Sequence, residues 1–250
     1  MLSKTDRKLE VVLFDLGNTL LYFDGIWDQV ISEMDAKLLH SLKSSGYQLD
    51  EQDFMHQAEV RFAKFDAKKS GEFLEYTTAF VLRSLLSDLG YAEIPEVDLR
   101  KAIRDMYTVS QSHWQLEADT LPTLQILRAE GYKLGIISNA GDDQDVQTLI
   151  DKAGIRPYFD IILTSAAQGI RKPNPRLFQQ ALQHWGAPPE RAVMIGDTLG
   201  ADILGAKNAG IYSIWITRRT SPDQPHQDMI FPDKTVDTLS ALPGLLNALG

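Results

Sequence analysis

Five polar residues that could act together in phosphoryl transfer are spread along this chain. Asp15, Ser138 and Asp197 each stand at the end of a short apolar run, Asn139 follows Ser138, and Lys172 lies shortly before an Asn-Pro pair. Carboxylates bind Mg²⁺ or act as nucleophiles, a hydroxyl and free N–H groups bind phosphate oxygens, and a lysine neutralises negative charge. This combination favours a site for magnesium-dependent phosphoryl transfer.

Each of these residues also has an ordinary structural explanation. An aspartate after a strand is often a turn former or a helix cap, and a Ser-Asn pair is common in turns. A single lysine before a helix is usually solvated. The prediction therefore depends on whether the fold brings all of them to one place.

Apolar runs alternate with amphipathic segments over most of the chain, which predicts strands alternating with helices. Three of the helices are expected to end at Gly131, Gly154 and Gly210, and another to begin at Asn174-Pro175. Such alternation with short turns predicts an α/β fold with a doubly wound parallel sheet. The predicted strands are residues 10–15, 133–138, 159–164, 192–196 and 212–216, and the predicted helices are residues 121–130, 144–153, 200–209 and 239–249, with a surface loop at residues 217–234.

The polar residues fall at one predicted edge of this sheet. In open parallel sheets, ligands bind beyond the carboxyl ends of the strands. Asp15, Ser138 and Asp197 are at such ends, and Lys172 is in the loop after the strand at residues 159–164. We therefore expect these side chains to converge.

Residues 26–113 have a different pattern, with apolar residues at helical spacing and no convincing strand. They predict about four helices, with turns near residues 45–46, 70–71 and 90–95. An all-helical block after the first strand favours an inserted domain over helices that merely cover the sheet, because an α/β fold rarely needs four consecutive helices. The expected domains are a core at residues 1–22 and 116–250 and a helical cap at residues 23–115.

The composition disfavours several classes of protein. The chain has 250 residues, 44% of them hydrophobic, no cysteine and a net charge of −9. The acidic balance disfavours non-specific binding to nucleic acid or to an anionic membrane, and the lack of cysteine excludes disulfides and thiolate chemistry. Since no apolar run suggests a membrane span or a secretory signal, a cytoplasmic location is expected.

Four segments together resemble the motifs of the haloacid dehalogenase (HAD) superfamily, in the order typical of that family. Residues 14–20 (FDLGNTL) resemble the first motif, and residues 137–139 (ISN) resemble the second. Residues 169–175 (GIRKPNP) resemble the third, and residues 195–197 (IGD), continued to Asp202, resemble the fourth. The resemblance covers nearly the whole chain and implies a phosphatase-like hydrolase with a helical cap inserted after the first motif.

The resemblance also implies a role for each matching residue. Asp15 would be the nucleophile and a magnesium ligand, and Gly17 would offer its backbone carbonyl to the metal. Asp197 would bind Mg²⁺, Asp202 would support the metal directly or through water, and Thr19 would brace the nucleophile loop.

Three further residues match positions that hold the phosphate. Ser138 and the backbone of Asn139 would bind phosphate oxygens. Lys172 would bridge the nucleophile and the phosphoryl group. The implied cofactor is Mg²⁺, and the implied partner is a small phosphorylated metabolite.

Gly17 departs from the family pattern, because family phosphatases usually carry a second aspartate two residues after the nucleophile. That aspartate protonates the leaving group, and general acid–base catalysis is typically worth about 10²–10⁴-fold. Asp24 or His113, near the expected hinges at residues 23–25 and 113–117, could replace it. Alternatively, the substrate has a good leaving group, such as a sugar hemiacetal phosphate or an acyl phosphate.

The missing aspartate also keeps other functions open. The chain could be a catalytically weak protein that binds a phosphorylated ligand or a partner. A phosphonatase would need a cap lysine, for which Lys64, Lys68 and Lys69 are candidates. A dehalogenase is disfavoured by Asp197 and Asp202, which such enzymes do not usually retain. The sequence specifies neither the substrate nor the oligomeric state.

Overall fold

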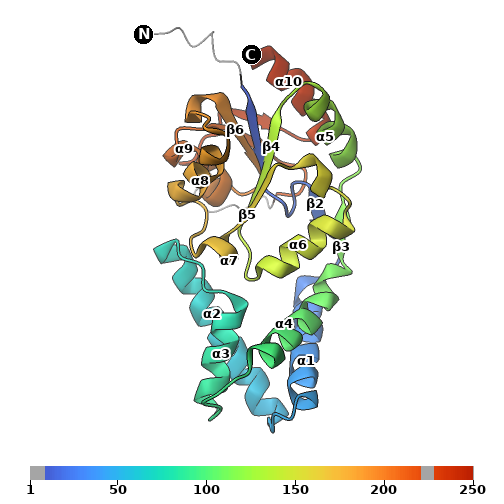
Figure 1. The fold of residues 1–250 in the computed structure, drawn as a ribbon, viewed down its shortest axis with the longest axis vertical. Coiled ribbons are helices and arrows are strands. Elements are labelled where there is room, and N and C mark those ends of the chain that lie inside the picture. Colours follow the sequence, from blue (N-terminus) through green and yellow to red (C-terminus); the bar gives the residue numbers. More distant parts are fainter. Residues whose placement is uncertain (1–8, 221–227, 250) are drawn as a thin grey trace.

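A parallel six-stranded sheet forms the centre of the larger part of the protein (Figure 1). The computed structural model describes residues 9–220 and 228–249. The strands lie in the order β5-β4-β1-β6-β7-β8. Their bounds are β1 (Val11–Phe14), β4 (Lys133–Ser138), β5 (Ile161–Thr164), β6 (Ala192–Gly196), β7 (Tyr212–Ile216) and β8 (Lys234–Val236).

Strand β1 lies in the middle of this sheet and determines where the site forms. Phe14 pairs with Ile136 of β4 on one side and with Ile195 of β6 on the other. After β1, the chain adds β4 and β5 on one side of it and then β6, β7 and β8 on the other. The direction in which strands are added therefore reverses at β1. Because ligands bind where the order of an open sheet reverses, Asp15 lies at the expected position for a ligand site.

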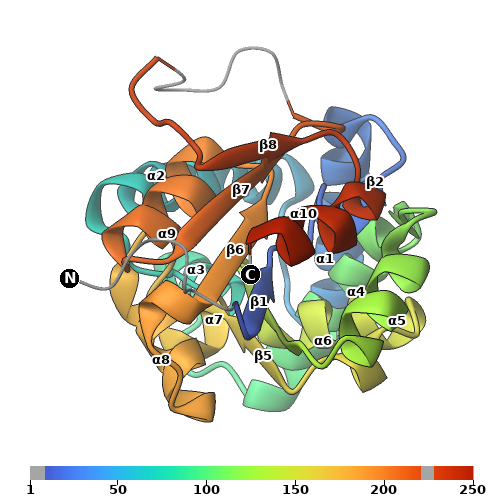
Figure 2. The same ribbon diagram turned by 90° about the horizontal axis from the view of Figure 1, so that it is seen from above.

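Helices cover both faces of the sheet, as the strand pattern predicts (Figure 2). On one face lie α5 (Thr120–Ala129), α6 (Asp143–Lys152) and α10 (Leu242–Leu249). On the other lie α8 (Pro175–Trp185) and α9 (Leu204–Asn208). Alternate residues of β1 point to opposite faces of the sheet. Val12 and Phe14 pack in the hydrophobic core on the face covered by α5, α6 and α10, and Val11 and Leu13 pack in the core on the face covered by α8 and α9.

The predicted helical block forms a separate layer at the end of the sheet where the strands terminate (Figure 1). It contains α1 (Trp27–Ser44), α2 (Glu51–Glu72), α3 (Thr78–Asp88) and α4 (Glu96–Gln111). Asp50 and Thr77 cap α2 and α3 by accepting hydrogen bonds from backbone N–H groups. These helices bury their own hydrophobic cluster, which includes Leu38, Leu82 and Leu99. The prediction of an α/β sheet with an additional helical block is confirmed.

Several elements differ from the sequence-based expectations. Two antiparallel strands, β2 (Leu21–Phe23) and β3 (Trp114–Leu116), join the helical block to the sheet, and three residues are too few to show a strand period. The turn expected near residues 70–71 lies two residues later, because α2 continues to Glu72 and the chain turns at Phe73, which has a φ of 53°.

Further differences lie near the ends of the sheet strands. A π-helical turn, Leu199–Ile203, precedes α9, and a short helix, α7 (Ser165–Gln168), follows β5. The expected loop at residues 217–234 reaches into β8, and residues 221–227 of it lie outside the described residues. The remaining short helical turns are Arg156–Tyr158, Pro189–Arg191 and Leu239–Ala241. Within the described ranges, no helix is both long and apolar enough to cross a membrane.

Candidate active site

Lys172 forms a buried ion pair with Asp15 at the end of β1. The Nζ atom of Lys172 is 2.5 Å from Oδ1 of Asp15 and 2.7 Å from Oδ1 of Asp202. It also donates a hydrogen bond to the carbonyl oxygen of Ile137 at 2.6 Å. With only 3% of its surface exposed, Lys172 is a fixed positive charge beside Asp15.

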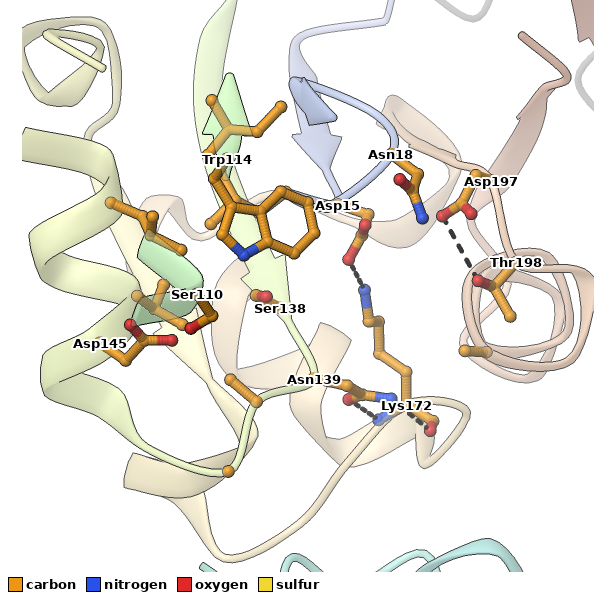
Figure 3. A pocket seen from close by; sticks show the side chains of 18 of the residues that line it. Asp15, Asn18, Ser110, Trp114, Ser138, Asn139, Asp145, Lys172, Asp197 and Thr198 are labelled. Atoms are coloured by element: carbon orange, nitrogen blue, oxygen red, sulfur yellow. Dashed lines mark hydrogen bonds and ion pairs between the residues drawn. The ribbon is translucent and has the colours of Figure 1, made fainter. Parts of the chain in front are cut away.

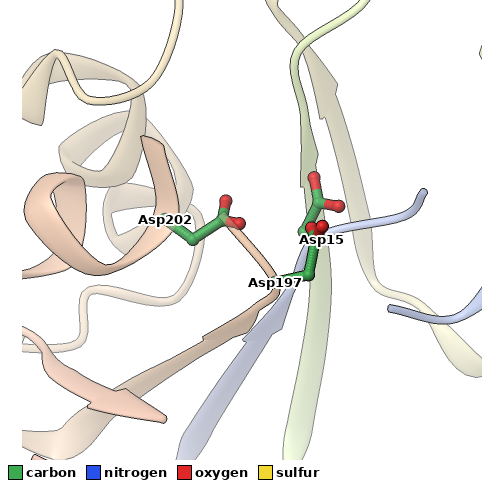
Figure 4. Close-up of side chains that lie close together, drawn as sticks. All are labelled: Asp15, Asp197 and Asp202. Carbon is green, nitrogen blue, oxygen red and sulfur yellow. The ribbon is translucent and has the colours of Figure 1, made fainter. Parts of the chain in front are cut away.

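Asp15, Asp197 and Asp202 form a cluster of three buried carboxylates (Figure 4). One oxygen from each lies within 4.8 Å of the others. Asp15 follows β1 and Asp197 follows β6, whereas Asp202 comes from the π-helical turn. The cluster thus arises from the convergence of two neighbouring strand ends and one helical turn.

Gly196 allows the carboxylate of Asp202 to approach the backbone of β6. A Cβ atom at position 196 would lie 2.3 Å from Cγ of Asp202, which no real side chain could tolerate. Oδ2 of Asp202 accepts a hydrogen bond from the N–H of Thr198 at 3.0 Å. The missing side chain and this hydrogen bond together position Asp202.

Burial and mutual repulsion perturb the charges of the cluster. Burial raises the pKa of Asp15, although the charge of Lys172 opposes this shift. Burial also raises the pKa of Asp197, and the negative charges of Asp15 and Asp202 raise it further. Burial alone would lower the pKa of Lys172, but its two carboxylate neighbours outweigh burial and raise it. A single lysine therefore does not balance the negative charge of this site.

Ser138 and Asn139 lie at the same edge, at the end of β4. Ser138 is buried beside the cavity, which Asn139 also lines. Oδ1 of Asn139 accepts a hydrogen bond from the backbone N–H of Lys172 at 2.8 Å, and its Nδ2 donates to the carbonyl of Lys172 at 3.0 Å. The side chain of Asn139 therefore holds the loop that carries the lysine.

The loop after Asp15 contains three unusual positions. Thr19 is fully buried, and its hydroxyl has no hydrogen-bond partner among the described residues. Asn18 has a φ of 56°, a left-handed conformation that asparagine tolerates better than most residues. Gly17 lies against the indole of Trp114, which occupies the space that a side chain would need.

A cavity of about 390 Å³ opens in front of these residues (Figure 3). Sequence analysis did not identify the residues on its other walls, because nothing in their local patterns marks them as near Asp15. Among them are Ser110, Trp114 and Asp145, and the motif neighbours Asn18 and Thr198 line the cavity as well. Nε2 of Gln111 donates to Asp145 at 2.8 Å, and burial raises the pKa of Asp145 to about 6.

Asp24 and His113, the suggested substitutes for a general acid, do not line this cavity. Instead, Nδ1 of His113 donates to the backbone carbonyl of Asp24 at 2.8 Å. None of the three cap lysines considered for a phosphonatase lines the cavity either. Of these, Lys69 pairs with Glu75 at 3.0 Å, and Lys68 lies over the ring of Phe65.

A comparison with known protein families supports the resemblance that the four motifs indicated. The model of the haloacid dehalogenase-like hydrolase family matches residues 9–210, which is most of the chain. The protein belongs to this family. The hydrolase is also similar over nearly its whole length to rat N-acylneuraminate-9-phosphatase, at 31% identity over 97% of this chain and 95% of the relative.

Other relatives match over a shorter stretch. Glyceraldehyde 3-phosphate phosphatase from Methanothermobacter thermautotrophicus is 40% identical over 51% of this chain and 57% of its own length. Phosphoserine phosphatase from Thermus thermophilus is 31% identical over 64% of this chain and 61% of its own length. The chain thus spans little more than half the length of these two relatives.

Solved structures of the same fold include both phosphatases and dehalogenases. The HAD phosphatase from Thermococcus onnurineus is 26% identical, with a TM-score of 0.64 and coverage of 95% of this chain and 98% of that one. The 2-haloacid dehalogenase from Pseudomonas syringae pv. Tomato DC3000 is 25% identical, with a TM-score of 0.68 and coverage of 97% and 100%. The fold is therefore common to more than one type of reaction.

The donor set of the hydrolase fits a magnesium ion. Mg²⁺ prefers hard oxygen ligands and is usually bound by one or two carboxylates together with water and phosphate oxygens. Three buried carboxylates within 4.8 Å of one another provide such ligands. Because Lys172 supplies only one positive charge to them, a divalent cation would relieve the repulsion that raises the pKa of Asp197.

Proposed function

We propose that this hydrolase is a magnesium-dependent phosphatase that acts on a small phosphorylated metabolite. The observation that carries the proposal is the position of Asp15, at the reversal point of the sheet, with Lys172 2.5 Å away and two more carboxylates beside it. The three relatives described above are named as phosphatases of small phosphorylated metabolites, which supports the same substrate class.

In this proposal Asp15 is the nucleophile. A carboxylate oxygen of Asp15 attacks the phosphorus, the bond from phosphorus to the leaving oxygen breaks, and an aspartyl-phosphate results. Water then cleaves the aspartyl-phosphate and releases inorganic phosphate. Lys172 offsets the negative charge that develops on the phosphoryl group, while the hydroxyl of Ser138 and the backbone N–H of Asn139 bind phosphate oxygens.

The metal would be held by the carboxylates of Asp15 and Asp197 and by the backbone carbonyl of Gly17. Asp202 would support it directly or through water, and buried Thr19 would pack beneath the nucleophile loop. When bound, Mg²⁺ would neutralise charge on the phosphoryl oxygens and orient the phosphate.

We also propose that residues 23–115 act as a cap on a core formed by residues 1–22 and 116–250. The separate hydrophobic cluster of the four helices supports a distinct unit. Strands β2 and β3 lie where the two segments of chain pass between these parts. In such an arrangement, cap closure would exclude water and contribute to substrate choice.

The proposal is tested by measuring hydrolysis of p-nitrophenyl phosphate and of a panel of small phosphorylated metabolites with Mg²⁺ or with EDTA. Activity should require Mg²⁺, and Asp15→Asn should lower kcat by at least about 10³-fold, because it removes the nucleophile. Asp28→Asn, which changes an exposed carboxylate of α1, is the matched control and should retain activity. Full activity in Asp15→Asn would exclude Asp15 as the nucleophile.

Gly17 supports a second candidate, a catalytically weak protein that binds a phosphorylated ligand. The test is a thermal-shift titration with inorganic phosphate and Mg²⁺ on protein that shows no turnover. A raised Tm without hydrolysis of any substrate would favour binding over catalysis. Release of chloride from a 2-haloacid would instead favour the dehalogenase branch.

A further inference from the structure

Trp114 covers the position where family phosphatases carry the second aspartate. A Cβ atom at Gly17 would lie 3.1 Å from Cη2 of Trp114 and 3.5 Å from its Cζ3. The first distance is shorter than ordinary van der Waals contact, so the indole would have to move by a few tenths of an ångström to admit a side chain at position 17. The backbone of Gly17 is not left-handed, so crowding rather than backbone strain opposes a side chain there.

The indole is held in this place by two aromatic neighbours, one from β2 and one from the start of α1. Trp114 begins β3 and pairs with Phe23 of β2. The rings of Phe23 and Trp27 stack with centroids 3.8 Å apart, and Trp114 meets both of them edge-on, at 5.4 Å and 6.1 Å. Moving the indole away from Gly17 would therefore disturb three packed aromatic rings.

The free side of Trp114 forms a wall of the cavity next to the nucleophile. Figure 3 shows the indole beside Asp15, on the side of Ser110 and Asp145. Trp27 also lines the cavity. A leaving group attached to a phosphoryl group at Asp15 would extend into this space, where it meets the aromatic surface of Trp114, and position 17 offers it no acid.

We propose that Trp114 is a specificity-determining residue that restricts hydrolysis to phosphate esters of weakly basic, ring-bearing leaving groups. This inference rests on the proposed phosphatase function. When the phosphorus–oxygen bond breaks, its electron pair stays on the leaving oxygen, which then takes a proton from water. A weakly basic oxygen tolerates this charge, whereas an alkoxide needs a proton that no side chain at position 17 supplies.

The ring of such a leaving group stacks on the indole of Trp114. Phenols and the anomeric hydroxyl of sugars share the required chemistry, since both are ring-bearing and less basic than ordinary alcohols. The two sources are distinguished by comparing phenyl phosphate with a hexose 1-phosphate, and both with the alkyl ester glycerol 3-phosphate.

The first experiment measures kcat/KM of the wild-type protein with Mg²⁺ on these three esters. The alkyl ester should be at least about 10²-fold slower than the better of the other two, because it loses most from the missing acid. Equal values for all three would overturn the role of Trp114 while leaving the phosphatase proposal intact. No hydrolysis of these esters or of p-nitrophenyl phosphate would overturn both.

The second experiment compares Gly17→Asp, Trp114→Ala and the double variant. Gly17→Asp alone should gain little on glycerol 3-phosphate, because even the Cβ of the new side chain crowds the indole of Trp114. The double variant should gain about 10²-fold or more on that ester, with an acid limb in its pH profile. Trp114→Ala alone should raise KM for the preferred ring-bearing ester by up to about 10-fold, because stacking is lost.

Trp27→Ala combined with Gly17→Asp is the matched control. It removes an aromatic ring of the same cluster, but not the one within 4 Å of a Cβ at position 17. It should release much less of the gain than Trp114→Ala does, because the indole that lies against position 17 is still present. The inference is overturned if Gly17→Asp alone matches the double variant, or if a double variant with wild-type circular dichroism and Tm gains nothing.

Discussion

At the residue scale, the geometry of the site depends on a few positions where the charge or the size of the side chain is critical. Lys172 is buried between Asp15 and Asp202, so it serves as a fixed counter-charge rather than a solvated lysine. Gly196 matters through what it lacks, since its missing Cβ makes room for the carboxylate of Asp202. Neither feature is visible in the local sequence, where Lys172 resembles an ordinary loop residue and Gly196 simply ends a predicted strand.

Gly196→Ala should weaken magnesium binding by about 10–100-fold, the usual effect of disturbing a residue that supports a metal site. The new methyl group would displace the carboxylate of Asp202 from Lys172 and from the N–H of Thr198. Gly200→Ala is the matched control, because a Cβ there meets nothing within 4 Å. Calorimetric titration with Mg²⁺ measures the difference, and equal affinities of the two variants would contradict the argument.

At the scale of elements, the structure follows local pattern where an element is long or fully buried. All four residues of β1 are buried, and predicted apolar positions such as Leu38, Leu85 and Leu99 form the core of the helical block. Short elements such as β2 and β3 depend instead on each other, because their hydrogen bonds cross from residue 22 to residue 115. No local signal could have placed them.

Helix α1 contains an aspartate, Asp35, whose charged form is disfavoured by burial. Burial, helped by the negative charge of Glu59 on α2, raises the pKa of Asp35 from 3.8 to about 6. Ionising Asp35 therefore costs more in the folded than in the unfolded protein. This penalty is absent below pH 3.8, grows as the pH rises towards 6, and is fully present at neutral pH.

Asp35→Asn should raise the free energy of unfolding at neutral pH by about 1 kcal/mol, a value reduced from the full shift because Asp35 is partly exposed. At a pH below the unfolded value of 3.8, the variant and the wild type should be equally stable. Urea unfolding across this range provides the measurement. Glu33→Gln, which removes an exposed charge from the same helix, should show no such pH-dependent gain.

At the scale of the whole molecule, the helical block contacts the sheet domain directly beside the site. The backbone N–H of Arg171 donates to the carbonyl of Phe73 at 3.1 Å, and that of Glu75 donates to Gly169 at 3.0 Å. The buried carboxylate of Glu75 accepts a hydrogen bond from Ser165 at 2.7 Å. In this arrangement, which we call closed, the loop after α2 touches the segment that carries Lys172.

A double-mutant cycle of Glu75→Ala and Ser165→Ala tests whether this closed arrangement persists in solution. The coupling energy should be about 1.5–3 kcal/mol, as for other hydrogen bonds to charged groups. Urea unfolding of the wild type, both single variants and the double variant gives this value. The cycle also cancels the separate loss of the hydrogen bond from the N–H of Ala140 to Ser165. A coupling energy near zero would mean that the cap is open in solution.

The local sequence alone determined that Asp15, Ser138 and Asp197 stand at the ends of buried strands. It could do so because a buried strand and the turn that follows it are encoded by adjacent residues. The same kind of signal predicted the doubly wound sheet and the helical block, and the motif resemblance then indicated what Asp15 and Lys172 could do.

Only the tertiary structure decided how closely these residues approach one another. The ion pair between Lys172 and Asp15 joins positions 157 residues apart, and the indole of Trp114 reaches Gly17 from the far end of the helical block. Such distances depend on how separate elements pack, and packing is a property of the whole chain rather than of any segment. The fold therefore decided that an aromatic ring lies against Gly17.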